Sequence, residues 1–149
     1  GRLNGVILDP SHCWLISIGD NVTMAPRVHI LCHDASTKQF LGYTKIGRVN
    51  IGNNVFIGAE SVVLPGVTIG NNVIIGANST VTKSIPDNMV AAGTPAKIIS
   101  SLEEYLSKNR EKIKTASVYG VDYTLRGNLT EDKKEQMVKG LEGQMGYID

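Results

Sequence analysis

The sequence predicts an all-β fold, a parallel β-helix in which short strands and corners wind into stacked triangular coils. Three observations predict it: a six-residue repeat before Ser100, Gly and Asn at regular places within that repeat, and a rise in charge where the repeat ends. A period of six fits neither an amphipathic helix nor a simple alternating hairpin. A short strand followed by a corner fits it, and three such units close one coil.

The repeat carries an aliphatic residue at its first place and a small or aliphatic residue at its fifth. The first places are Ile18, Met24, Ile30, Ile51, Ile57, Val63, Ile69, Ile75 and Val81. The fifth places are Val22, Val28, Val55, Ser61, Val67, Val73, Ser79 and Ile85. Residues three repeat units apart should stack along the axis at the strand spacing of about 4.8 Å, which forms aliphatic ladders. The ladders are the predicted core.

The repeat breaks between Ile30 and Ile51, whose separation is not a multiple of six, so the stretches before and after the break are out of phase. We expect a loop to leave the β-helix at about residues 34–45. The Gly residues and Asn pairs at the middle of the units suit corners with unusual backbone angles, so we interpret the Asn pairs as structural.

Charge divides the chain near Ser100. Residues 1–99 hold 12 of the 29 charged side chains, and residues 100–149 hold the other 17. We therefore expect a β-helix domain over 1–99 and a C-terminal extension over 100–149.

The extension has the signals of two α-helices, at about 100–114 and 130–139. Ser101 and Thr130 are the predicted N-caps. The segment 118–129 is expected to be irregular. We expect the helices to cover the open end of the coil stack, where unpaired strand edges would invite association.

Composition favours a protein that acts on small molecules. A net charge of +1 gives no strong field for nucleic acid or a membrane surface. No apolar run reaches the roughly 18 residues of a membrane span and no signal pattern is present, so we expect a cytoplasmic protein. Cys13 and Cys32 predict neither a disulfide framework nor a structural zinc site, and we expect two buried thiols.

Four strings resemble the hexapeptide acyltransferase superfamily. They are IGNNVFIGA at 51–59, VLPGVTIG at 63–70, IGANSTVTK at 75–83 and VAAGTPAK at 90–97. Within it, the chain is most similar to the maltose, galactoside and nodulation O-acetyltransferases and to their relatives in surface-polysaccharide gene clusters. The resemblance covers about residues 4–99. It implies left-handed coiling, a homotrimer with active sites between adjacent subunits, and acetyl-coenzyme A as co-substrate.

His33 lies where the repeat breaks, at the place where the resembling enzymes carry their catalytic histidine. A neutral imidazole can accept the proton that a hydroxyl loses as it attacks a thioester. The resemblance therefore implies direct acetyl transfer to a hydroxyl of a sugar or polysaccharide precursor, with His33 as general base and no metal required. It also implies the backbone N–H of Ala59 as the donor to the developing oxyanion.

The resemblance also implies a set of coenzyme-binding residues. They are Ala59, Ala77, Thr82, Lys83, Pro95 and Lys97. The first three match positions that pair with the pantetheine arm. Lys83 and Lys97 fall where the family binds the phosphate end of the coenzyme, and a phosphate needs such cations. Pro95 is expected to shape the turn around the adenine.

The acceptor side is assigned by position alone. Asp9 lies near the family's acceptor-binding carboxylate and is expected to hold sugar hydroxyls. The spacing from Asp9 to Ile18 is slightly longer than in the galactoside enzymes, so this role also fits Ser11 or His12. His12 is interpreted as a substrate ligand or as a group that orients His33.

Two aromatic residues complete the predicted site. Phe56 stands where many relatives carry Trp beside the reaction centre, so it keeps an apolar wall and lacks the indole N–H. Tyr43, in the loop, is placed to cover the site from a neighbouring chain, although an exposed loop residue is the simpler interpretation.

Other functions fit parts of the same pattern. An N-acetyltransferase acting on an amino sugar or sugar nucleotide would also use a base at His33. A metal enzyme of the γ-carbonic anhydrase type would use His12, His29 and His33 as zinc ligands. A noncatalytic scaffold is the third alternative.

Overall fold

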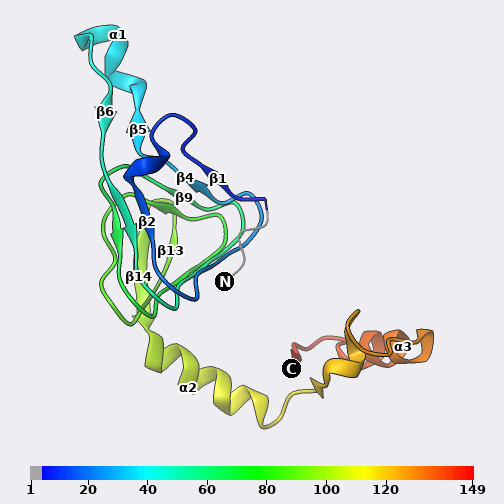
Figure 1. Cartoon of the computed structure of the whole chain (residues 1–149). Helices are drawn as coiled ribbons and strands as arrows, with labels where there is room; N and C mark the ends of the chain where they lie inside the picture. Colours follow the sequence, from blue (N-terminus) through cyan, green and yellow to red (C-terminus); the bar gives the residue numbers. More distant parts are fainter. Residues whose placement is uncertain (1–4) are drawn as a thin grey trace. The chain divides into compact units, whose positions relative to one another are not determined.

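The computed structural model describes residues 5–149 and divides into two compact units, Gly1–Tyr105 and Leu106–Asp149. Residues 1–4, the start of the predicted β-helix domain, lie outside the described residues. The first unit is a stack of coils built from short strands (Figure 1). The division falls within helix α2 (Leu102–Ile113), slightly beyond the boundary predicted from charge.

Three sheets form the three faces of the coil stack. The first face holds β1 (Ile7–Leu8), β4 (His29–Ile30), β9 (Val62–Val63) and β12 (Thr80–Val81). The second face holds β2 (Ile16–Ile18), β7 (Val49–Ile51) and β10 (Thr68–Ile69). The third face holds β3 (Thr23–Met24), β8 (Phe56–Ile57), β11 (Ile74–Ile75), β13 (Met89–Gly93) and β14 (Ala96–Ser101). The pairing is parallel throughout these faces except between β13 and β14.

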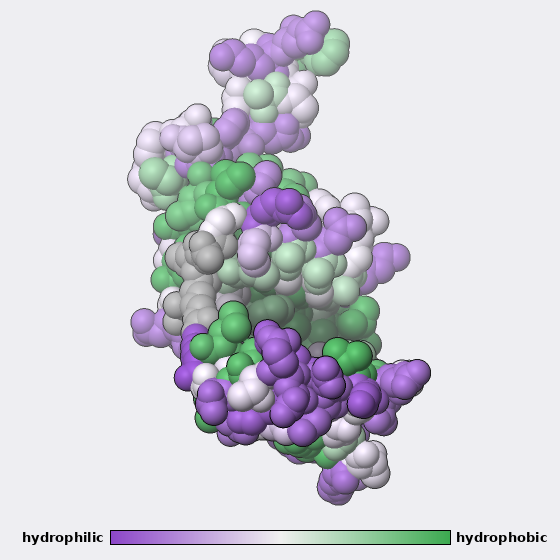
Figure 2. Space-filling view, turned by 90° about the vertical axis from the view of Figure 1, so that its right-hand side faces the viewer, coloured by the Kyte–Doolittle hydropathy of each residue, from purple (hydrophilic) through white to green (hydrophobic). Residues whose placement is uncertain are grey.

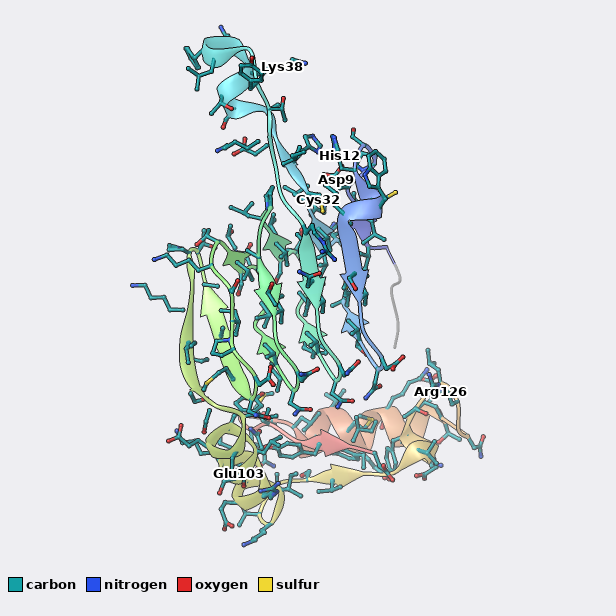
Figure 3. The ribbon with its side chains drawn as sticks, turned by 60° about the vertical axis from the view of Figure 1, so that its left-hand side comes forward. Asp9, His12, Cys32, Lys38, Glu103 and Arg126 are labelled. Atoms are coloured by element: carbon teal, nitrogen blue, oxygen red, sulfur yellow. The ribbon has the colours of Figure 1, made fainter. Side chains whose placement is uncertain are left out.

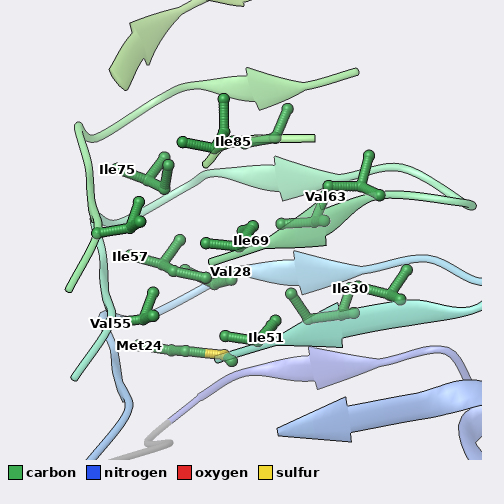
Figure 4. Close-up of a cluster of buried hydrophobic side chains, with 14 of the residues drawn as sticks. Met24, Val28, Ile30, Ile51, Val55, Ile57, Val63, Ile69, Ile75 and Ile85 are labelled. Atoms are coloured by element: carbon green, nitrogen blue, oxygen red, sulfur yellow. The ribbon is translucent and has the colours of Figure 1, made fainter. Parts of the chain in front are cut away.

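The strand register confirms the predicted ladders. The paired residues are Ile51 with Ile69, Ile57 with Ile75, and Val63 with Val81. Figure 4 shows aliphatic side chains stacked inside the coils, and the paired Ile57 and Ile75 are labelled there. All the fifth places are buried, and all the first places are buried except Ile18, which is partly exposed. Each buried aliphatic side chain contributes roughly 1.5–3 kcal/mol of transfer free energy, so the repeat itself builds the core.

The corners between the faces differ in composition, and each is named for a typical residue. The alanine corner contains Pro26, Ala59 and Ala77, the histidine corner contains residues 31–33, 64–66 and 82–84, and the asparagine corner contains Asn21, Asn54, Asn72 and Asn88. At the asparagine corner each side chain donates to the next one at 2.9–3.0 Å, and all four residues have φ between +53° and +60°. Asn tolerates this left-handed backbone better than most residues do. The structural interpretation of Asn54 and Asn72 is therefore confirmed.

The segment expected as a loop is an ordered hairpin. It runs through β5 (His33–Asp34), the 3-10 helix Ala35–Thr37, α1 (Lys38–Leu41) and β6 (Lys45–Ile46). Strands β5 and β6 pair antiparallel, and the hairpin projects from the coil stack (Figure 1). Figure 2 shows hydrophilic and hydrophobic surface side by side on this projection, where Phe40, Leu41 and Tyr43 are exposed.

The third face ends in an antiparallel strand. β14 folds back along β13, so the parallel part of this face ends at β13 and β14 is its edge strand. We expected the C-terminal helices to cover the open end of the coil stack, and this stays a prediction.

The C-terminal unit carries two helices near the expected ranges. Its elements are most of α2, β15 (Val118–Tyr119), the 3-10 helix Val121–Tyr123, α3 (Glu131–Gly140) and β16 (Tyr147–Ile148). Ser101 and Glu104 exchange hydrogen bonds as a capping box, and Thr130 caps α3. The expectation of an irregular segment at 118–129 is wrong at its start, because β15 pairs with β16. No helix among residues 5–149 is long and apolar enough to cross a membrane.

Candidate active site

A buried carboxylate joins the first coil to the histidine corner. Asp9 follows β1, and its Oδ2 accepts hydrogen bonds from the backbone N–H groups of Cys32 at 2.8 Å and His33 at 3.0 Å. Its Oδ1 accepts from the N–H groups of Ser11 and His12, both at 2.9 Å. The fifth contact is the His33 ring, whose Nδ1 lies 2.5 Å from Oδ2. Figure 3 shows Asp9, His12 and Cys32 together near the base of the hairpin.

Electrostatics keep this carboxylate ionised. Burial by itself would raise the pKa of Asp9, whose side chain is fully buried. The hydrogen bonds from Cys32, from the His33 ring and from the following turn outweigh burial, and they hold the pKa of Asp9 well below its usual range. An ionised Asp9 accepts the Nδ1 proton of His33 and thereby assigns the tautomer, which leaves a lone pair on Nε2. The His33 side chain is 31% exposed, so a substrate can reach the ring.

The structure places Asp9 differently from the expectation. A side chain with 0% exposure and five hydrogen bonds has no surface to offer to sugar hydroxyls. Asp9 is instead the partner of His33. Sequence reasoning missed this pairing because Asp9 and His33 lie 24 residues apart in two successive coils.

His12 lies beside the same pair. Its ring centroid is 5.3 Å from that of His33, and its Nδ1 is 3.9 Å from Asp9 Oδ1. This Nδ1 is buried and has no hydrogen-bond partner among the described residues. The side chain is 29% exposed, so His12 borders the site in either of its two predicted roles.

The three predicted histidine ligands of a zinc enzyme do not converge. Within residues 5–149, the group that could hold a metal is Asp9, His12 and His33, with ligand atoms within 4.8 Å of one another, and His29 is not part of it. A metal on Asp9 and His33 would displace the 2.5 Å hydrogen bond between them. The geometry fits a proton-transfer pair better than a metal centre. The cysteines are free, with Cys32 buried, but Cys13 is exposed, which contradicts the expectation of two buried thiols.

A surface pocket lies beside the histidine corner. Its volume is about 420 Å³, and its walls include Asp34, Lys45 and Ile46 from the hairpin and Leu64, Gly66 and Thr82 from the corner. The Lys45 ammonium, 2.5 Å from Asp34, holds the pKa of Asp34 well below its usual range. Thr82, a predicted coenzyme residue, therefore borders an open pocket next to the base of the hairpin.

The alanine corner holds another group of predicted residues. Phe56 projects outward from β8 with 45% exposure, just before Ala59 in the chain. Among the described residues, the backbone N–H groups of Ala59 and Ala77 donate no hydrogen bond, so both are available to a ligand. Pro95 lies in the turn between β13 and β14 next to this corner, and Lys97 pairs with Ala92 in the same hairpin.

One chain does not bring the two groups together. The register aligns His29 with Val62, so Ala59 precedes the first face and His33 follows it. The two predicted catalytic groups therefore lie at opposite ends of that face. Lys83, at the histidine corner, is likewise separated from Lys97, beside the alanine corner.

Known proteins resemble this chain in sequence and in structure. The family model described as bacterial transferase hexapeptide (six repeats) matches residues 48–83. The protein CapG of Staphylococcus aureus is 47% identical over 127 residues, which cover 83% of this chain and 69% of that protein. The structure of galactoside acetyltransferase in complex with coenzyme A superposes with a TM-score of 0.60 at 38% identity, covering 68% of this chain and 52% of that one. A mutant of AntD, an N-acyltransferase from Bacillus cereus in complex with dTDP and coenzyme A, superposes with a TM-score of 0.54 at 27% identity, covering 67% of this chain and 60% of that one.

The coils of six-residue repeats, together with these similarities, place the protein among the hexapeptide-repeat acyltransferases. The chain belongs to the bacterial hexapeptide transferase family, which confirms the resemblance drawn from its repeats. Its solved neighbours have the left-handed parallel β-helix fold and include complexes with coenzyme A and with acetyl-coenzyme A, which is the co-substrate of this class. The chain spans only about half of the galactoside acetyltransferase chain.

The structure adds one residue that the sequence interpretation did not consider. Trp14 lies in the 3-10 helix Cys13–Leu15, and its side chain is 72% exposed. Its ring centroid is 5.3 Å from that of His12. The only signal in the sequence was the extra length between Asp9 and Ile18, which contains this helix.

Proposed function

We propose that the protein is an O-acetyltransferase that moves the acetyl group of acetyl-coenzyme A to a hydroxyl of a sugar or polysaccharide precursor, with His33 as general base. The observation that carries the proposal is the buried, ionised Asp9 on Nδ1 of His33, which leaves Nε2 as a proton acceptor at an accessible ring. The similarity to the galactoside O-acetyltransferase of Escherichia coli supports a hydroxyl acceptor.

The proposed reaction proceeds by direct attack. Nε2 of His33 takes the proton of the acceptor hydroxyl while the oxygen forms a bond to the thioester carbonyl carbon. The N–H of Ala59 donates to the oxyanion of the tetrahedral intermediate. The intermediate then expels the coenzyme A thiolate, which receives the proton from the His33 imidazolium. Asp9 stabilises that imidazolium and keeps the ring oriented, and the products are an acetyl ester and a free thiol.

The decisive experiment is an acceptor screen. Purified protein is incubated with acetyl-coenzyme A and a panel of sugars while the release of free thiol is followed. At least one pyranoside should accelerate thiol release well above the rate of hydrolysis. If no member of a broad panel does so, the proposal of a sugar acceptor is wrong.

A second candidate function is N-acetyl transfer to an amino sugar or a sugar nucleotide. The similarity to AntD, an N-acyltransferase seen with dTDP, favours it. Amino sugars in the same panel test it, and the products separate the two reactions chemically. Hydroxylamine cleaves an acetyl ester and leaves an amide intact.

The positions of Ala59 and His33 in the chain support a homotrimer with shared active sites. Ala59 and His33 lie at opposite ends of one face, so a site that uses both must combine the histidine corner of one chain with the alanine corner of the next. A closed ring of three chains supplies three such sites. The same arrangement brings Lys83 near the Lys97 of a neighbour.

Mixing two inactive variants tests the shared site. His33→Ala removes the base, and Ala59→Pro removes the backbone N–H that receives the oxyanion. After subunit exchange at equal amounts, each intact site needs His33 from one chain and Ala59 from the next, so about a quarter of wild-type activity should return. No recovery, together with a stable monomer in sedimentation, would place the active site within one chain.

The two lysines give a test of coenzyme binding. Lys83→Ala and Lys97→Ala should each weaken the affinity for acetyl-coenzyme A about ten- to hundredfold, because each removes a charge-assisted contact to phosphate worth about 1.5–3 kcal/mol. Calorimetric titration should show smaller losses with dephospho-coenzyme A. Lys108→Ala, an exposed lysine in α2, serves as the control with unchanged affinity. Unchanged binding in both variants would move the phosphate site elsewhere.

A further inference from the structure

The turn that follows Asp9 builds a second surface next to the proposed base. Asp9 Oδ1 accepts from the N–H groups of Ser11 and His12, and the 3-10 helix Cys13–Leu15 begins at the next residue. The same carboxylate that orients His33 therefore also anchors the start of the segment that carries Trp14.

Three aromatic rings lie in series on this surface. The ring centroids of Trp14 and His12 are 5.3 Å apart, and those of His12 and His33 are also 5.3 Å apart. The planes are tilted by 48° and 43°. Trp14 is thus two ring contacts away from the imidazole that would deprotonate the acceptor.

Trp14 has no place in the hydrophobic core. Its side chain is 72% exposed, and it is neither among the buried cluster nor among the residues that pack against that cluster. A single exposed apolar side chain is common on protein surfaces. This one differs because it contacts His12, which in turn contacts His33, and because it follows a turn that the buried Asp9 holds.

We propose that Trp14 and His12 form the acceptor subsite, in which a neutral pyranose ring lies against the indole of Trp14 and hydrogen-bonds to His12. An indole offers an apolar face at low conformational cost, which matches the C–H face of a pyranose. The partly exposed His12 provides a polar edge beside it. The hydroxyl to be acetylated then points towards His33. This inference rests on the proposed function and names the residues that select its acceptor.

Binding can be observed without turnover, because Trp14 is the only tryptophan of the chain. Titration with neutral pyranosides should quench or shift its fluorescence in the intact protein. An acyclic alditol with a similar number of hydroxyls should leave the emission unchanged, because it presents no ring face. A pyranoside that accelerates thiol release without any change in fluorescence overturns the subsite and leaves the proposed function standing. If no sugar releases thiol but pyranosides alone change the fluorescence, the subsite stands and the proposed transfer fails.

Substitution separates the subsite from the chemistry. Trp14→Ala should raise the KM for the acceptor about three- to tenfold, and Trp14→Phe should recover most of that loss, as expected for a lost aromatic contact. The kcat and the KM for acetyl-coenzyme A should stay within twofold. Leu125→Ala, which truncates a side chain that is 92% exposed in the C-terminal unit, is the matched control with no effect. An unchanged acceptor KM in Trp14→Ala overturns the proposal. A larger loss for amino sugars than for neutral sugars would also overturn it, because it would indicate a cation–π site.

Discussion

His33→Ala should lower turnover about 10²–10⁴-fold, the range that a positioned general base contributes, while acetyl-coenzyme A affinity stays within a few fold. His33 is in β5 at the base of the hairpin and is not part of the buried aliphatic cluster. The variant should therefore fold, with Asp9 still held by four backbone N–H groups. Thiol release under saturating acetyl-coenzyme A and acceptor measures the loss.

The control for His33→Ala is a second histidine of the same coil, His29. His29→Ala changes a partly buried histidine in β4, on the first face. It should retain near-normal turnover because His29 is not part of the cluster around Asp9. Near-normal turnover in His33→Ala combined with an inactive His12→Ala would assign the base to the earlier coil.

The core of the β-helix was predictable because the six-residue period of aliphatic residues indicates which side chains point inward. Ile57 and Ile75 are both completely buried and pair in register, as a coil of three repeat units requires. The asparagine corner was predictable for a related reason, since few residues other than Gly accept a left-handed backbone there. Both features depend on local sequence that repeats, so neither needs knowledge of distant contacts.

The first coil was not predictable in the same way. Ile7 pairs with His29, a step longer than one regular coil, because the 3-10 helix Cys13–Leu15 is inserted into that coil. Without this register, nothing in the sequence shows that Asp9 meets Cys32 and His33. The contact of the Asp9 carboxylate with the next coil is a tertiary contact, and no local sequence pattern predicts it.

The repeat places the two proposed catalytic groups, Ala59 and His33, at different corners of the coil. Ala59 and His33 occupy corners on either side of the first face, and this follows once the register of β4 and β9 is known. The family resemblance implies active sites between adjacent subunits but does not say which corner of each chain would face such a site. The register is what makes a shared site the simplest proposal.

Asp9→Asn should lower turnover by about 10²–10⁴-fold with little change in the KM for acetyl-coenzyme A, because the neutral amide no longer fixes the His33 tautomer or stabilises its imidazolium. It should also lower the free energy of unfolding at neutral pH by about 1–3 kcal/mol, since an amide cannot accept from all five donors around this buried position. Thiol-release kinetics and urea unfolding at a fixed protein concentration measure the two effects.

The pH dependence of stability tests whether Asp9 stabilises the fold through its negative charge, because Asp9→Asn keeps the shape of the side chain and removes the charge. The folded-state pKa of Asp9 lies below the ordinary value, so its ionised form stabilises the fold above about pH 4, and this contribution declines as the pH falls towards the folded-state pKa. The difference in stability between wild type and Asp9→Asn should therefore shrink in acid.

If Asp9 acts only through His33, adding Asp9→Asn to His33→Ala should cost no further turnover. A full additional loss in the double variant would show that Asp9 serves the reaction independently of His33.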